Sequence, residues 1–238
     1  MMEDITTKQL DIATEELYRV FSRYPYNSDM PACPCCTTNE HKRALTSKTL
    51  RLLQGDDIGE FAYSAITTWG DVDDLKHFLP RILELKAKDD LWADTFVVLG
   101  KLEYTDWRSW RKEEQDAVYN FILAWWQYAA KTKSYYDRYD FKEFYKVVGD
   151  VNIMLERWQV SVKDKSIYSY IEFVSYEFTN LFNYKGDLFK LLGREGTDKV
   201  IAWIMANKPR LQDAFFYFEK TDPGLAQKAS DVLYILEH

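Results

Sequence analysis

Apolar residues recur every three or four positions through most of the chain, which is the spacing of one face of an α-helix. The first such segment covers residues 6–24, where Leu10, Leu17 and Phe21 fall on one stripe and Pro25 ends the pattern. Further helices are predicted over residues 58–69, 71–83, 110–131, 141–158, 167–182 and 225–237. We therefore expect about nine to eleven helices joined by short turns.

Capping and breaking residues predict where several helices begin, end or bend. Thr6 has the spacing of a capping box at the start of the first helix. Asp222 followed by Pro223 predicts the start of the last helix, with Asp222 as the N-cap. Pro80 lies inside a helical pattern and predicts a kink or a break in the turn before it. Gly186, Gly193 and Gly196 predict loose joints.

Two segments leave strand and helix as alternatives. Residues 91–104 are apolar nearly all round, which predicts a buried central helix, although the run 96–99 also fits a buried strand. Residues 159–166 alternate Val160 and Val162 with polar side chains, as a short hairpin would. The remaining pattern favours helix.

Successive amphipathic helices with short connections pack as antiparallel hairpins. We therefore predict an all-α protein, an irregular array of stacked antiparallel helical hairpins resembling an α-α superhelix or a bundle, because no strict repeat is present. No Gly/Ser linker divides the chain, so residues 1–238 are expected to form a single domain with a Pro/Cys-rich loop at 25–47. The favoured internal boundary is the polar segment 131–140.

The composition of the chain argues against some classes of partner and indicates a cellular compartment. The chain has only 9 Gly and 6 Pro among 238 residues, which fits long helices with few turns. A net charge of −7 makes nucleic-acid binding unlikely, because phosphate contacts depend on clustered cations. The most apolar stretch, residues 121–130, is too short for a membrane span. With no secretory signal and an odd number of cysteines, a cytoplasmic location is expected.

The strongest candidate for chemistry is the sequence Cys-Pro-Cys-Cys beginning at Cys33, with His41 five residues after its end. Thiolate and imidazole are ligands that tetrahedral zinc prefers, and Cys33 and Cys36 have the spacing that lets two sulfurs meet one ion. Neighbouring side chains such as Cys35 and Cys36 are expected to point apart. A zinc site would thus use Cys33, Cys36, His41 and a further donor, or Cys35 in a strained loop.

Two other interpretations of these cysteines stay open. Cys33 and Cys36 also have the Cys-x-x-Cys redox spacing, but the βαβ context of that motif is missing. The remaining alternative is a set of inert, partly buried thiols held by prolines.

A second candidate cluster combines Asp73, Asp74 and His77. On a helix the carboxylates and the imidazole share a face, as acid–base or metal chemistry would require. The favoured alternative is structural, because Asp71, Asp73 and Asp74 lie where a helix N-terminus stabilises negative charge.

Aromatic and arginine residues gather in two segments and suggest an interaction surface with another protein. The residues are Trp107, Arg108, Arg111, Tyr135, Tyr136, Arg138 and Tyr139. Tyrosines that simply cover a helical core are the alternative.

The loop with Cys33, Pro34, Cys35 and Cys36, followed by the segment Thr-Trp-Gly-Asp-Val-Asp-Asp-Leu-Lys-His-Phe-Leu-Pro-Arg-Ile-Leu-Glu-Leu at 68–85, resembles a family of bacterial proteins with no established activity. The likeness covers residues 20–90 and, more loosely, the last helix. It implies a bacterial origin and assigns no catalytic residue.

The sequence contains no phosphate-binding glycine loop, nucleophile elbow or His-Glu-x-x-His motif, so an enzyme is not favoured. We expect a non-enzymatic protein-binding role, as a scaffold or an immunity-type partner. The alternative is a zinc-binding protein or metal-dependent enzyme centred on Cys33, Cys36 and His41.

Overall fold

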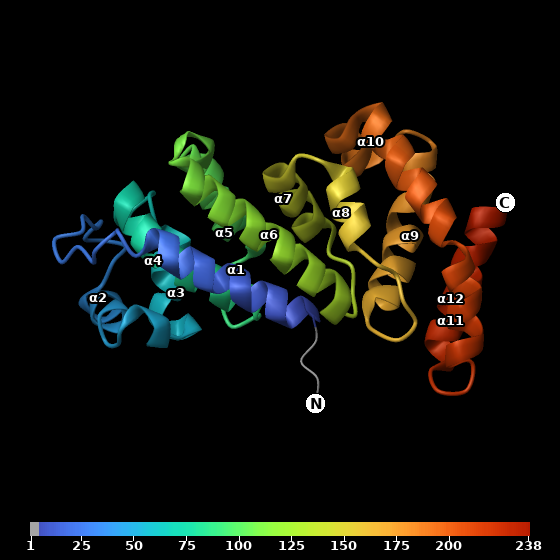
Figure 1. Ribbon diagram of the computed structural model, residues 1–238, viewed down its shortest axis with the longest axis horizontal. Coiled ribbons are helices and arrows are strands. Elements are labelled where there is room, and N and C mark those ends of the chain that lie inside the picture. Colours follow the sequence, from blue (N-terminus) through green and yellow to red (C-terminus); the bar gives the residue numbers. More distant parts are fainter. Residues whose placement is uncertain (1–4) are drawn as a thin grey trace. The chain divides into compact units, whose positions relative to one another are not determined.

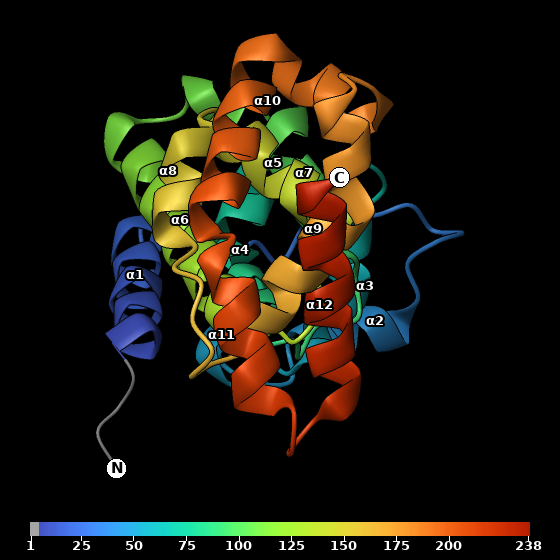
Figure 2. The ribbon, with the colours of Figure 1, turned by 90° about the vertical axis from the view of Figure 1, so that its right-hand side faces the viewer.

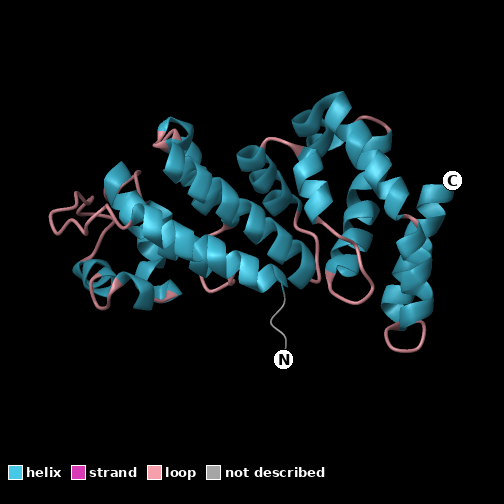
Figure 3. Cartoon of the chain, viewed as in Figure 1, coloured by secondary structure: helices cyan, strands magenta, loops and turns pink. Residues whose placement is uncertain are grey.

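A computed structural model describes residues 5–238, which contain twelve α-helices, two short 3₁₀ helices and no strand. The all-α prediction is confirmed (Figure 3). In chain order the helices are α1 (Ile5–Phe21), α2 (Asn39–Leu45), η1 (Leu50–Leu52), α3 (Gly55–Ser64), α4 (Val72–Ala87), α5 (Thr95–Tyr104), η2 (Trp107–Ser109), α6 (Lys112–Thr132), α7 (Arg138–Val148), α8 (Val151–Arg157), α9 (Ser166–Phe182), α10 (Gly186–Asn207), α11 (Pro209–Phe218) and α12 (Pro223–Glu237) (Figure 1).

The chain divides into two compact units, Met1–Trp125 and Trp126–His238. The boundary lies inside α6, several residues before the predicted boundary segment 131–140. Because one helix is continuous through this boundary, the division does not test the single-domain prediction, which stays a prediction.

The first unit is built around α4, which packs against α1, α3 and α5. Its core includes Phe61, Phe78 and Trp69, with ring centroids 4.6 Å apart between Phe61 and Phe78 and 5.4 Å apart between Phe61 and Trp69. All three side chains are at most 3% exposed. Since burying one large apolar side chain contributes about 1.5–3 kcal/mol, this aromatic layer is a major source of stability for the unit.

The second unit is built around α9, which packs against α10, α11 and α12. Trp158 is 2% exposed and lies within ring-contact distance of Trp126, Phe173 and Trp203, at 5.6, 5.3 and 5.1 Å. The last two helices, α11 and α12, form an antiparallel hairpin that is plain in Figure 2.

Several predicted helix boundaries in the first unit are wrong. The helix expected over 58–69 ends at Ser64, and Trp69 lies in the following turn with its backbone paired to Ala32 and Ala65. The break expected before Pro80 does not occur, because α4 continues through it to Ala87. A proline inside a helix removes a single backbone hydrogen bond. The buried side chains around Pro80 stabilise the helix despite this loss.

The segment 91–104 is neither a strand nor a fully buried helix. Its helical part, α5, begins only at Thr95, and Trp92 and Phe96 are 53% and 56% exposed. An apolar residue is not necessarily a core residue, because burial depends on which neighbouring elements cover it.

In the second unit, Gly149 has φ +75° and separates α7 from α8, so the helix predicted over 141–158 is two helices. Asp137 caps α7. No strand forms at 159–166, which removes the hairpin alternative. Of the three predicted loose joints, Gly193 interrupts α10 with φ +66° and ψ −176°, and Gly186 begins the helix with φ +83°. The prediction is wrong for Gly196, which lies within α10 without interrupting it.

The two predicted caps have different outcomes. Asp222 caps α12 and accepts a hydrogen bond from the Leu225 N–H at 3.0 Å, with Pro223 at the first helical position, which confirms the prediction. Thr6 lies inside α1 and does not cap it, because the helix already includes Ile5.

Candidate metal centre in the cysteine loop

The cysteine loop is fastened to the turn that follows α3. The Cys33 N–H donates to the Thr68 carbonyl at 2.8 Å, and the Gly70 N–H donates to the Pro31 carbonyl at 2.7 Å. Gly70 has φ +73°, a conformation that favours glycine. Since Trp69 between these contacts is buried, the loop is anchored to the core of the first unit.

The three cysteine sulfurs lie close together. Cys33 Sγ is 3.0 Å from Cys35 Sγ, Cys35 Sγ is 3.6 Å from Cys36 Sγ, and all three lie within 4.8 Å of one another. The prediction that Cys35 and Cys36 point apart is wrong. A tight turn brings them together, because the Cys36 and Thr37 N–H groups both donate to the Cys33 carbonyl.

Hydrogen bonds among the thiols separate their acidities. The side chain and backbone of Cys35, followed by those of Cys36, donate to the Cys33 sulfur and lower the pKa of Cys33 to about 7. The Cys35 thiol donates to Cys33, and this bond raises the pKa of Cys35 to about 11. Cys33 therefore ionises before Cys35, and a thiolate is the form that binds metal ions.

The sulfur spacing fits one thiophilic metal ion. Ligands about 2.3 Å from a tetrahedral zinc are separated from one another by about 3.8 Å. The observed separations of 3.0 and 3.6 Å are both somewhat shorter than that value, so small side-chain rotations would bring the sulfurs to it. Cys33 is half-buried and the other two are exposed, which leaves an ion access from solvent.

His41 does not join the three sulfurs. Its backbone N–H donates to Thr38 Oγ1 at 3.2 Å, and its Nδ1 accepts from the Thr38 N–H at 3.4 Å, which together form the capping box of α2. Among residues 5–238, the group of potential metal ligands contains Cys33, Cys35 and Cys36 and not His41. The structure thus brings together three of the four predicted ligands and uses the fourth to begin a helix.

The second predicted cluster is explained by helix capping. Asp71 Oδ1 accepts from the N–H groups of Asp73 and Asp74, and Asp74 Oδ2 accepts from the Asp71 N–H at 2.9 Å. This is a capping box at the start of α4. Asp74 is buried in that role and Asp73 is exposed, so the structural alternative describes both carboxylates.

His77 is held by a different partner. Its Nδ1 lies 2.8 Å from the Tyr24 carbonyl. A carbonyl only accepts, so Nδ1 carries the proton and His77 donates to it. The imidazole ties α4 to the chain just after α1 and is not paired with Asp73 or Asp74.

The predicted interaction residues of the first unit are only partly exposed. Trp107 is 4% exposed, with its Nε1–H donating to Glu103 at 3.2 Å, so it belongs to the core and the prediction is wrong for it. Arg108 stacks over the Trp107 ring at 4.9 Å and pairs with Glu103. Arg111 is exposed.

In the second unit, two of the predicted interaction residues serve a buried carboxylate. Arg138 donates to Glu177 Oε1 through Nε and Nη2 at 3.1 and 2.9 Å, and the Tyr136 hydroxyl donates to the same oxygen at 3.3 Å. Burial, together with Glu177, raises the pKa of Tyr136. Tyr135 and Tyr139 are 48% and 66% exposed and remain available at the surface.

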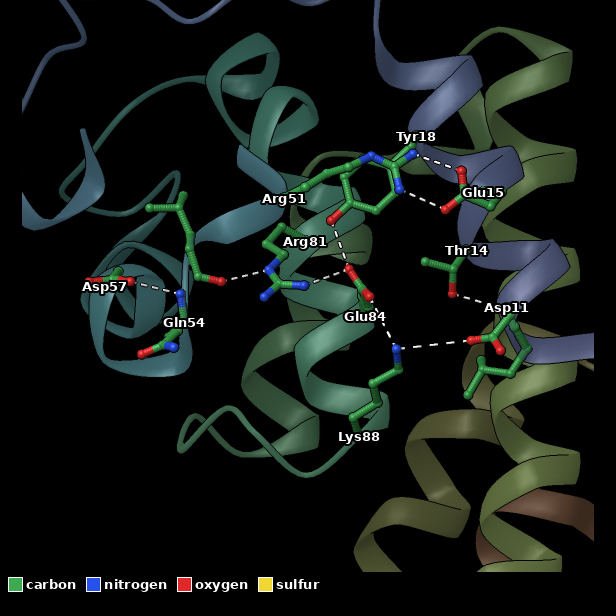
Figure 4. A network of polar contacts seen from close by, with 12 residues as sticks. Asp11, Thr14, Glu15, Tyr18, Arg51, Gln54, Asp57, Arg81, Glu84 and Lys88 are labelled. Carbon is green, nitrogen blue, oxygen red and sulfur yellow. Dashed lines mark hydrogen bonds and ion pairs between the residues drawn. The ribbon is translucent and has the colours of Figure 1, made fainter. Parts of the chain in front are cut away.

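A polar network in the first unit had no signal in the sequence (Figure 4). Glu84 on α4 accepts from the Tyr18 hydroxyl and from Arg81, both at 2.8 Å, and from Lys88 at 3.1 Å. Burial raises the pKa of Glu84, but these three donors outweigh it and the net pKa is lowered. The network joins α1 to α4 through Tyr18 and Glu84, which are 66 positions apart in the sequence. The spacing of residues along one helix could not predict such a contact.

No family model, curated protein or solved structure matches this chain. The resemblance to a bacterial family stays a prediction. None of the helices within residues 5–238 is both long enough and apolar enough to cross a membrane.

Proposed function

We propose that the protein binds a zinc ion through Cys33, Cys35 and Cys36. The observation that carries the proposal is the convergence of three sulfurs within 4.8 Å of one another in a loop of the first unit. Thiolates are soft ligands that favour zinc or Cu(I) over magnesium, calcium or manganese. Since His41 is used as a cap, the fourth position would be taken by water or by a donor from another molecule.

The anchoring of the loop supports a role for the ion in holding its shape. Cys33 is tied by its own N–H to Thr68, and the other two cysteines follow in the same turn. An ion bound to all three would therefore fasten the exposed end of the loop to a segment already fixed by Trp69. We propose a structural or sensing ion and no catalytic step.

Zinc loading of the purified protein tests this proposal. We expect stoichiometric zinc after loading and desalting, and we expect Cys33→Ser and Cys36→Ser each to weaken zinc affinity by more than about 100-fold, beyond the loss typical of an outer-shell partner. These cysteines are the only thiols in the chain, so a thiol-counting reagent reports on this loop alone. All three thiols should react in the metal-free protein and be protected in the loaded protein.

His41→Ala is the matched control, because His41 lies in the same segment but outside the group of sulfurs. Its zinc affinity should stay within about threefold of the wild type. Retention of zinc by Cys33→Ser would contradict the proposal. Preferential uptake of Cu(I) would keep the thiol site and change the metal, whereas rapid formation of a disulfide in place of metal binding would favour redox chemistry.

A second candidate is the protein-binding role that the composition suggests. We propose it because large aromatic side chains are exposed in both units, including Tyr104 at 75%, Tyr139 at 66% and Phe216 at 70%. Aromatic residues of this size are enriched at protein interfaces. This role does not depend on the metal, and the two proposals can stand or fall separately.

A further inference from the structure

Two glycines of α3 allow another segment to lie directly on the helix. A Cβ added to Gly55 would be 1.9 Å from the Asp90 carbonyl oxygen, and one added to Gly59 would be 2.1 Å from Trp92 Nε1. Glycine inside a helix costs about 1 kcal/mol relative to alanine. In α3 this cost is offset by close packing, because a side chain at either position would collide with Asp90 or Trp92.

This approach fixes a half-exposed tryptophan on the helix. The Trp92 indole lies against the backbone at Gly59, and its ring centroid is 5.7 Å from that of Tyr63, one turn further along α3. We name Tyr63 and Trp92 the aromatic platform; they are 54% and 53% exposed. Large aromatic groups held rigid and open to solvent are typical of binding surfaces.

The segments that carry the aromatic platform contain acidic residues and no basic residue. The chain has no Lys or Arg in residues 52–75 or 89–100, the segments that supply both rings. Those segments carry Asp56, Glu60, Asp90 and Asp94, and none of these four pairs with a cation in the described residues 5–238. Cations that contact these segments are engaged by them: Lys48 pairs with Asp57 at 2.6 Å, and Lys101 is 7% exposed and donates to the Tyr63 carbonyl at 2.7 Å.

We propose that the aromatic platform docks an arginine-rich segment of a partner protein. A guanidinium stacks on aromatic faces and forms paired hydrogen bonds with carboxylates. The same two segments of the chain supply both the aromatic rings and the carboxylates. Phosphate-bearing partners are disfavoured by the carboxylates. The proposal rests on the protein-binding role and gives it a location and a partner chemistry.

The test uses a labelled synthetic peptide of alternating Arg and Gly, with matched peptides that carry Lys or Gln in place of Arg. Binding is measured by fluorescence anisotropy at physiological ionic strength, where distant charges are screened. We expect the Arg peptide to bind more tightly than the Lys peptide, and the Gln peptide not to bind. Trp92→Ala and Tyr63→Ala should each weaken binding at least about tenfold, as hot-spot residues do.

Control variants separate this surface from general acidity. Tyr176→Ala removes a similarly exposed ring from α9 of the second unit and should leave binding unchanged. Asp56→Asn combined with Asp94→Asn should weaken binding, whereas Glu219→Gln combined with Asp231→Asn removes the same charge elsewhere and should not. Asp94 makes no side-chain cap bond, so its substitution spares α5. Gly59→Ala keeps every ring and displaces Trp92, so it should weaken binding as well.

Circular dichroism is used to check that each variant folds. Trp92→Phe, which retains an aromatic ring, should recover part of the affinity lost in Trp92→Ala. Equal affinity of wild type and Trp92→Ala would overturn the proposal, as would equal binding of the Gln and Arg peptides. A cellular partner that co-purifies equally with wild type and Trp92→Ala would leave the protein-binding role in place while overturning this site for it. Zinc content is unaffected by any of these outcomes.

Discussion

Lys76 is a cation inside the core of the first unit, and its partners explain how it is tolerated there. Its Nζ lies 2.9 Å from Glu114 Oε2 and 3.1 Å from the Tyr24 hydroxyl, and it sits over the Trp110 ring at 4.4 Å. The Tyr24 hydroxyl in turn donates to Glu114 at 2.6 Å. Every charge is therefore paired, which is the condition under which a buried ion is not destabilising.

Removing one member of this pair should be costly. We expect Lys76→Met to lower the free energy of unfolding by about 3–5 kcal/mol, because Glu114 is fully buried and would lose its cation. Urea denaturation at neutral pH measures the loss.

The matched control is Lys112→Ala, which removes a lysine from an exposed pair with Asp116, where the side chains are 80% and 52% exposed. Its effect should be below about 1 kcal/mol. Equal losses from the two variants would show that the buried pair has no special role.

At the scale of elements, glycines decide where helices stop and where they touch. Gly149 and Gly193 have positive φ and interrupt helical runs, whereas Gly55 and Gly59 keep ordinary helical geometry and admit another segment. The same residue type thus serves two purposes that the sequence pattern alone does not separate.

A comparison of Gly193 with Gly100 separates the effect of backbone conformation on stability from the effect of packing. Neither has an atom within 4 Å of an added Cβ, but only Gly193 has positive φ. Gly193→Ala should therefore destabilise the protein by about 1–3 kcal/mol through backbone strain. Gly100→Ala, inside α5, should stabilise it by about 0.5–1 kcal/mol. Thermal unfolding followed by circular dichroism measures both; a stabilising Gly193→Ala would refute the strained joint.

At the scale of the whole molecule, the cysteine loop lies outside the buried core. Cys33 is half-buried and Cys35 and Cys36 are exposed, whereas the cores of both units consist of helical apolar side chains. In this respect the protein differs from small zinc domains, whose folding depends on the ion.

Chelation should therefore leave the fold intact. We expect the far-ultraviolet helical signal of a zinc-loaded sample to be unchanged after treatment with a chelator, while the Tm falls by the few degrees that loss of a ligand of the native state implies. Loss of the helical signal on chelation would show that the ion is required for the fold itself.

The sequence by itself determined the helical class, most helix positions and the cap of the last helix, because these depend on neighbours three or four residues apart. It also located the thiol loop, since the three cysteines are nearly consecutive. The sequence predictions were wrong where contacts between distant segments determine the structure. Trp69 lies outside the predicted helix and its backbone pairs with Ala32, and Trp107 is buried.

Only the tertiary structure decided the function of individual polar groups. Lys76 pairs with Glu114, which is 38 positions away in the sequence, and the Trp92 indole packs against Gly59. The physical reason is that a side chain's role follows from what surrounds it, and packing of separate helices sets those surroundings in ways that the spacing along one helix does not encode.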